Sequence, residues 1–217
     1  TNPIPPVTNP TSAEILAKIQ PLLTPANRIN PNTPLYDSQD HTGKIYVYKL
    51  PGTNPVALVF QSSGAVDCDG QATTQCNINT DPWYQSETSF TQSDGKYLNA
   101  ATLPWYVLPS AGSSYFDYTK NNIGGGQLGL VMYGNNMNYG VFGDENGDRQ
   151  SIGELSYAMA SSLGINPDPH YGGVSCCGVT FIVFTGSENI VSPIENHDQA
   201  VTIGNTAMNK LWTQLGG

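Results

Sequence analysis

Carboxylates gather beside glycines and aromatic residues in two segments of this chain. The first segment holds Asp67 and Asp69, and the second, residues 142–154, carries Asp144 near its start and Glu154 at its end. We expect the second segment to leave a strand, cross a glycine-rich loop and enter a helix, so that Asp144 and Glu154 face one cleft. Two carboxylates across a cleft can cleave a glycosidic bond, because a protonated one donates to the leaving oxygen and an ionised one activates water or attacks the sugar. Glu154 suits the acid role, since partial burial raises the pKa of a carboxyl group.

The same residues also fit purely structural roles. Ser151 and Glu154 have the spacing of a capping box, in which the Glu side chain accepts a hydrogen bond from the backbone N–H of the Ser. Asp67 and Asp69 fit turns in which each side chain accepts a hydrogen bond from nearby backbone. Spacing alone leaves the catalytic and the structural interpretation open.

A calcium-binding loop is a third interpretation of the second segment. Asp144, Asn146 and Asp148 match the first, third and fifth positions of such a loop. The match then ends, because Arg149 stands where the loop needs glycine and Glu154 comes one position early. We therefore expect no calcium site here, and no metal or cofactor elsewhere.

The four cysteines favour a structural role. Cys68 and Cys76 enclose a short polar loop and are expected to form a disulfide. Cys176 and Cys177 are adjacent, so they are then either two free thiols or a vicinal disulfide. A zinc site is disfavoured, because the usual C-x-x-C spacing is absent and the three His residues are scattered.

Charge and composition restrict the class of partner. The chain has 8 Lys and Arg against 17 Asp and Glu, a formal net charge of −9. This balance argues against nucleic acid or an anionic membrane as partner and favours a cationic ligand. Only 12% of residues are charged, while 12 Tyr, 6 Phe and 3 Trp supply packing area, which is typical of a folded, β-rich secreted protein. No apolar run is long enough to span a membrane, and we expect that a leader was removed ahead of Thr1.

Hydrophobic patterning predicts a mainly β chain with a few helices. Strands are expected at residues 44–50, 56–61, 105–108, 127–133, 139–142 and 179–185, and helices at about 12–23, 152–163 and 198–215. The near-continuous apolar runs suggest a single-domain barrel or sandwich whose strands are buried on at least one face. Residues 1–11, with four prolines, are expected to form an extended arm.

Several short sequence motifs occur in a fixed order and spacing. Such a combination identifies a protein family far more specifically than any single motif does. The motifs are Asp67-Cys68-Asp69-Gly70, Thr80-Asp81-Pro82, residues 85–88, 95–100 and 103–109, Ile152-Gly153-Glu154 and residues 179–184. Together they resemble the chitosanases of glycoside hydrolase family 75, over roughly residues 35–190.

The resemblance implies endo-acting, inverting cleavage of β-1,4-linked glucosamine polymers by a β-barrel similar to the double-psi barrel of some endoglucanases. The essential carboxylates of the family fall on Asp144 and Glu154. Their separation is one residue longer here than in the family, so Glu145 and Asp148 are alternatives for the Asp role. Asp144 is preferred because it directly follows the Phe-Gly pair that ends the expected strand.

Chitosan carries ammonium groups, which suit the negative charge of the chain. The candidate substrate-binding residues are Asp67, Asp69 and Asp94 for the 2-amino groups, and Trp83, Tyr84 and Trp105 for stacking on sugar faces. Each also fits a simpler role, as a surface or turn carboxylate or as a ring buried in the core.

Taken together, we expect a secreted, monomeric endo-chitosanase with its catalytic domain at residues 12–217. Its partners would be chitosan and glucosamine oligosaccharides, with no nucleic acid and no membrane. Two alternatives stay open: a non-catalytic protein that binds aminopolysaccharides, and a hydrolase of another aminosugar polymer such as chitin or peptidoglycan.

Overall fold

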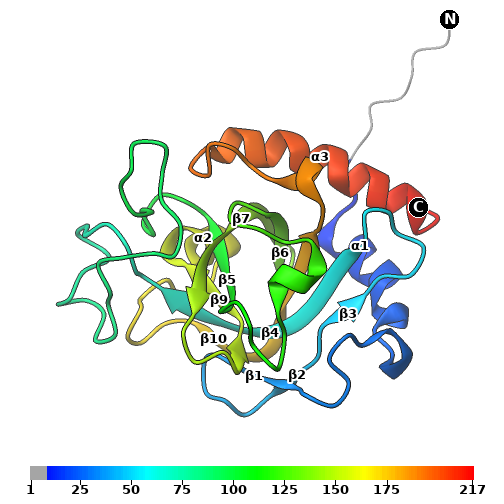
Figure 1. Cartoon of the computed structure of the whole chain (residues 1–217), viewed down its shortest axis with the longest axis horizontal. Helices are drawn as coiled ribbons and strands as arrows, with labels where there is room; N and C mark the ends of the chain where they lie inside the picture. Colours follow the sequence, from blue (N-terminus) through cyan, green and yellow to red (C-terminus); the bar gives the residue numbers. More distant parts are fainter. Residues whose placement is uncertain (1–8) are drawn as a thin grey trace, which may run out of the picture.

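The computed structural model describes residues 9–217 and is shown in Figure 1. Most of the predicted arm, residues 1–11, lies outside the described residues. Within residues 9–217, no helix of the protein is long and apolar enough to cross a bilayer.

A closed barrel of six strands forms the centre of the molecule (Figure 1). Its strands are β4 (Ala57–Asp67), β5 (Trp105–Pro109), β6 (Leu128–Tyr133), β7 (Asn136–Asn146), β9 (Glu154–Ser156) and β10 (Val174–Phe184). They are hydrogen-bonded in the order β10-β6-β7-β5-β9-β4, and pairing of β10 with β4 closes the ring. The β4–β9 and β5–β7 pairs are parallel and the others antiparallel. The predicted mainly β, single-domain barrel is confirmed.

The expected strand at residues 44–50 is divided between two sheets. β2 (Lys44–Ile45) joins β1 (Leu35–Asp37) and β8 (Ser151–Ile152) in a small sheet, whereas β3 (Tyr48–Lys49) extends the barrel sheet beside β4. Val47 lies between them, and its N–H donates to the Asn30 side chain at 2.8 Å while its carbonyl accepts from Ile29 at 2.9 Å. Because the backbone N–H and carbonyl of Val47 bond to the preceding segment, residues 44–50 do not form one continuous strand.

In the described part of the chain, three α-helices accompany the barrel: α1 (Ser12–Ile19), α2 (Tyr157–Leu163) and α3 (His197–Gln214). The terminal helix predicted at 198–215 is confirmed, and the first one is shorter than predicted, because a 3₁₀ turn at Gln20–Leu22 replaces its last part. Further 3₁₀ turns lie at Pro25–Asn27, Tyr118–Asn121 and Ser187–Asn189.

The helix predicted at 152–163 is only half correct. Ile152 ends β8, Glu154–Ser156 form β9, and helix α2 begins at Tyr157. The apolar spacing of this segment fits a helix, but its first half is instead hydrogen-bonded in strands: β8 to β1, and β9 to both β4 and β5. Sheet pairing with distant strands overrides the local periodicity.

The barrel wall separates two apolar clusters. Successive strand residues point to opposite faces, so Val59 packs with residues of α1 and α3 while the neighbouring Phe60 stacks on Phe181 in the other cluster. Both faces of the wall are therefore buried, which explains the near-continuous apolar runs in the strands. The long connection between β4 and β5 extends from the barrel on the side away from α1 (Figure 1).

Both cysteine pairs form disulfides. The predicted Cys68–Cys76 bond is present at the start of the β4–β5 connection, and Cys176 and Cys177 form the vicinal disulfide that the sequence left as one of two possibilities.

Candidate functional site

A cleft of about 560 Å³ opens where β4 ends and β9 begins, and we call it the acidic cleft. Its walls are formed by Ser38, Gln39, His41, Ala65, Val66, Asp67, Asp69, Asp81, Trp83, Gln85, Glu154, Pro169 and His170. Four of these side chains are carboxylates, and among the described residues no Lys or Arg lines the cleft. A polar, negatively charged cavity of this kind attracts a cationic ligand.

The glycine of the Ile-Gly-Glu segment sets the position of Glu154. Gly153 has a φ of +116°, and its carbonyl accepts the N–H of Ala65 at 3.0 Å, which starts the parallel pairing of β9 with β4. A Cβ atom at this position would lie 2.4 Å from the Ser62 hydroxyl oxygen. Only glycine adopts this backbone in this space, and it places Glu154 opposite Ala65, two residues before Asp67.

Glu154 is held in one orientation by Asn146, at the end of β7. The Asn146 Nδ2 donates to Glu154 Oε2 at 2.7 Å, while its Oδ1 accepts the N–H of Asp148 at 3.0 Å. Because the second bond fixes which end of the amide is the donor, the contact with Glu154 is also fixed. Burial raises the pKa of Glu154 well above its ordinary value, and the nearby Asp67 charge raises it further. Burial thus favours the protonated form of Glu154, and Oε1 is the oxygen that Asn146 leaves free for a proton.

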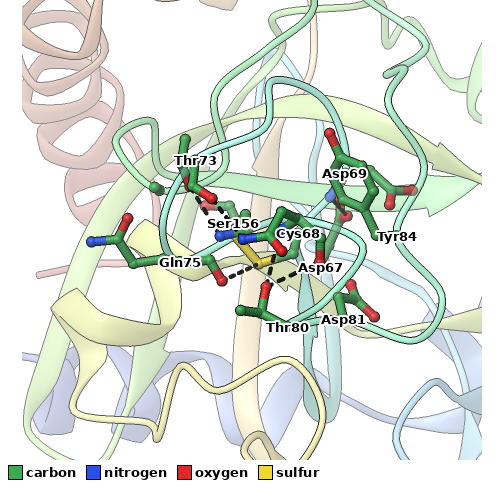
Figure 2. Close-up of a disulfide and its surroundings, with 12 residues drawn as sticks. Asp67, Cys68, Asp69, Thr73, Gln75, Thr80, Asp81, Tyr84 and Ser156 are labelled. Carbon is green, nitrogen blue, oxygen red and sulfur yellow. Dashed lines mark hydrogen bonds between the residues drawn. A yellow bond between two sulfur atoms is a disulfide. The ribbon is translucent and has the colours of Figure 1, made fainter.

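Asp67 and Asp69 lie at the end of β4 (Figure 2). Both line the acidic cleft together with Glu154. Asp67 accepts the indole N–H of Trp105 at 2.8 Å and the N–H of Asp69 at 2.9 Å, and Asp69 accepts the N–H of Gln85 at 2.7 Å. Burial, together with repulsion from neighbouring carboxylates, raises the pKa of Asp67 to about 7 and that of Asp69 to about 8. The two groups therefore titrate near neutral pH, and a bound cation would favour their ionised forms, with the proton lost to solvent.

Asp144 lies beside Asp67 and Asp69. A β-bulge in β7 determines its position. The register of β7 against β5 shifts at Gly143, whose Cα approaches Trp105 so closely that a Cβ would lie 2.6 Å from the indole. Asp144 Oδ1 accepts three hydrogen bonds, from the Ser89 N–H and hydroxyl at 2.7 and 2.6 Å and from the Glu145 N–H at 2.8 Å. Burial raises the pKa of Asp144 against the opposing effect of these bonds. Bulges often re-aim side chains at functional sites.

One carboxylate oxygen from each of Asp67, Asp69 and Asp144 lies within 4.8 Å of the other two. Three carboxylate oxygens at this spacing have the chemistry to hold a hard cation, although raised pKa values favour shared protons among them. This group shares only Asp144 with the calcium-loop pattern of the sequence. Asp148 instead accepts backbone bonds from Gln150 and Ser151, as in an ordinary turn.

The capping-box interpretation of Glu154 is wrong. Glu154 lies in β9, and α2 is capped by Ser156, whose hydroxyl accepts the N–H of Met159 at 3.1 Å. The Ser151 hydroxyl donates to Asp148 at 2.8 Å. Nothing in a helix cap therefore accounts for the placement of Glu154 in the acidic cleft.

The structure brings most of the predicted site residues together, but not all of them. Trp83 lines the acidic cleft, and Tyr84, whose hydroxyl donates to the Gly70 carbonyl at 2.7 Å, lies beside Asp69 (Figure 2). Trp105 is completely buried, so its ring offers no face to a sugar and its contact with Asp67 is that of a positioning group. Asp94 is exposed outside the cleft wall and pairs with Lys96 at 3.2 Å.

Several cleft contacts were not anticipated from sequence. Asn146 was considered only as a calcium ligand, and Ser89, Asp81 and His170 were not singled out. The alternation of Asn146 with two acidic residues was a usable signal. Asp81 lies in the Thr80-Asp81-Pro82 segment that carries the family resemblance. Ser89 and His170 had no signal, because their contacts join segments that are far apart along the chain.

Comparison with known proteins gives a consistent set of matches. The model of the family described as fungal chitosanase of glycosyl hydrolase group 75 matches residues 65–214. Endo-chitosanase C of Aspergillus oryzae is 30% identical over 168 residues, which cover 73% of this chain and 41% of that protein. Endo-chitosanase C of Aspergillus oryzae strain ATCC 42149 / RIB 40 is 30% identical over 172 residues, with the same coverage. The chain thus spans about two fifths of the length of these relatives.

Proposed function

The chain belongs to the fungal chitosanases of glycosyl hydrolase group 75, and from this we propose that it hydrolyses the β-1,4 bonds between glucosamine units of chitosan in an endo manner. The observation that carries the proposal is the position of Glu154, whose pKa is raised by burial, in a cleft lined by three further carboxylates. Chitosan presents ammonium groups, and the acidic cleft offers Asp67 and Asp69 to bind them by charge-assisted hydrogen bonds.

The proposed reaction is a single displacement with inversion. The proton on Glu154 Oε1 passes to the glycosidic oxygen as the bond from that oxygen to C1 of the sugar breaks. A water molecule attacks C1 from the opposite face, and Asp144 accepts the proton that the water loses. Oδ2 of Asp144 suits this role, because all three hydrogen bonds of the side chain go to Oδ1.

Asp144 is the best supported of the three candidates for the base. Glu145 accepts the N–H of Ala111 at 2.9 Å, and Asp148 is occupied by the turn at Ser151. Of the three, only Asp144 lies beside Asp67 and Asp69.

We also propose that the protein is secreted and monomeric, with its catalytic domain at residues 12–217. The Cys68–Cys76 disulfide supports secretion, because such bonds persist in oxidising compartments.

Release of reducing ends from soluble chitosan tests the proposal. The unmodified protein is expected to cleave chitosan, and Glu154→Gln to lose about 10²–10⁴-fold in kcat with its fold and oligomer binding retained. Glu188→Gln, an exposed residue in a 3₁₀ turn outside the acidic cleft, is the matched control and should keep full activity.

Three results would contradict the proposal. Binding of glucosamine oligomers without cleavage would indicate a non-catalytic binding protein. Faster cleavage of chitin or peptidoglycan would indicate another polymer, and full activity of Glu154→Gln would remove the assigned acid.

A further inference from the structure

A second wall of the acidic cleft comes from the loop between α2 and β10. Asp168 shapes this loop by accepting the N–H groups of His170 and Tyr171 at 2.9 and 2.8 Å, and the Gly172 N–H closes it on the Asp168 carbonyl at 2.8 Å. The rings of His170 and Tyr171 stack 3.9 Å apart. Tyr171 is 80% exposed. The loop therefore presents a fixed pair of stacked aromatic rings to solvent beside the cleft.

The β4–β5 connection meets this loop through Trp83. The Trp83 and His170 rings are 6.3 Å apart and nearly perpendicular, although they lie on loops distant in the sequence. Trp83 is 72% exposed, and both rings line the acidic cleft. Large apolar side chains are not usually left so exposed, and aromatic rings at the rim of a polar cleft suit the apolar faces of sugars.

Asp81 supplies a charge at the same place. Only 5% of its surface is exposed, and that part opens into the cleft. Its Oδ1 accepts the Trp83 N–H at 2.9 Å, whereas its Oδ2 has no hydrogen-bond partner within residues 9–217. Because Oδ2 has no partner among these residues and Asp81 lines the cleft, this oxygen is free to accept hydrogen bonds from a ligand.

We propose that Asp81, Trp83 and His170 form a binding subsite that selects a deacetylated sugar unit. The subsite lies at the rim, separate from Glu154 and Asp144. In it, Asp81 Oδ2 accepts hydrogen bonds from the 2-ammonium group, and the pyranose packs against the Trp83 and His170 rings. An N-acetyl group would remove the positive charge and add bulk at this point, so an acetylated unit is excluded. The inference rests on the proposed function, because it deepens the choice of substrate at the same cleft.

Partially acetylated chitosan tests the subsite. Asp81→Asn keeps an oxygen for the Trp83 N–H, so the fold is expected to survive. The sugars at the new chain ends are then identified by mass spectrometry and NMR. The unmodified protein should leave only glucosamine at one defined position relative to the cut, and Asp81→Asn should admit N-acetylglucosamine there.

Kinetics on fully deacetylated chitosan provide a second readout. Asp81→Asn and Trp83→Ala should raise KM about tenfold and change kcat less than threefold. Ile78→Ala is the matched control for Trp83, because Ile78 is 65% exposed on the same connection but does not line the cleft. Asp198→Asn, in the first turn of α3, is the control for Asp81.

The outcomes separate this inference from the proposed function. If chitosan is cleaved but both variants keep the end-residue pattern and KM of the unmodified protein, the subsite is refuted and the function stands. If the unmodified protein cleaves no chitosan, the proposed function fails and the subsite fails with it.

Discussion

Glu154 and Asp67 lie on paired strands, yet their hydrogen-bond partners differ. Glu154 receives one amide donor, from Asn146, whereas Asp67 receives an indole N–H and a backbone N–H. Hydrogen bonds to the charged form lower a carboxyl pKa and burial raises it. Glu154 thus receives fewer hydrogen bonds that favour its charged form, and its raised pKa suits a proton donor.

Asn146 is expected to position that donor. Asn146→Ala removes the bond to Glu154 Oε2 and lets the carboxyl rotate, so we expect kcat on chitosan to fall about tenfold with KM nearly unchanged. The control is Asn138→Ala, on the same strand, which removes a similar bond to the Ser162 hydroxyl away from the cleft. Equal activity of the two variants would show that Asn146 has no positioning role.

At this scale the sequence predicts the acidic residues but not their partners. The types and spacing of Asp67, Asp69 and Glu154 indicate a carboxylate site, and the structure brings them together. The bond from Trp105 to Asp67 and the pairing of Trp83 with His170 depend on how distant strands and loops meet. No local pattern encodes these contacts.

Two glycines determine how the strands present the carboxylates. Gly153 allows β9 to start beside β4, and Gly143 allows the bulge in β7 to pack against Trp105. The sequence predicts most barrel strands because their apolar runs are long. It does not predict the short strands at Ser151–Ile152 and Glu154–Ser156, because the apolar spacing of this segment also fits a helix.

Gly153→Ala is the test at the scale of the element. The positive φ and the contact with Ser62 should lower the free energy of unfolding by about 1–3 kcal/mol, seen as a fall of several degrees in Tm. Activity should fall as well, since Glu154 is displaced. Gly147→Ala, in the same acidic segment with open space around it, should change neither quantity. Similar stability of the two variants would show that Gly153 is not required.

Charge is the property of the whole molecule that the sequence predicts best. The net charge of −9 indicates a cationic ligand, and the structure gathers four of the carboxylates in one cleft. The sequence does not show that these groups share protons, since that depends on burial. Several exposed carboxylates, such as Asp94 and Asp168, have lowered pKa values instead, caused chiefly by hydrogen bonds from backbone N–H groups.

The raised pKa values predict how stability varies with pH. Asp67 and Asp69 have an ordinary value of 3.8 and folded values of about 7 and 8, so the folded state binds more protons than the unfolded state between these limits. Stability should therefore be greatest in mild acid and decrease as the pH rises from about 4 to 8.

Tm measured by calorimetry across this range checks the prediction. Asp69→Asn removes one of the two groups and should flatten the decrease. Asp94→Asn, whose carboxyl has a lowered pKa, should leave it unchanged between pH 5 and 8. A Tm of the unmodified protein that stays constant or rises from pH 5 to 8 would contradict the assigned proton sharing.

Digestion of the glucosamine hexamer, followed by NMR from the first minutes, tests the central claim most directly. A proton from Glu154 and a water activated by Asp144 on opposite faces of the sugar predict that the α-anomer of the shorter products appears first and then mutarotates. An intact hexamer, or products that appear first as the β-anomer, would contradict the account.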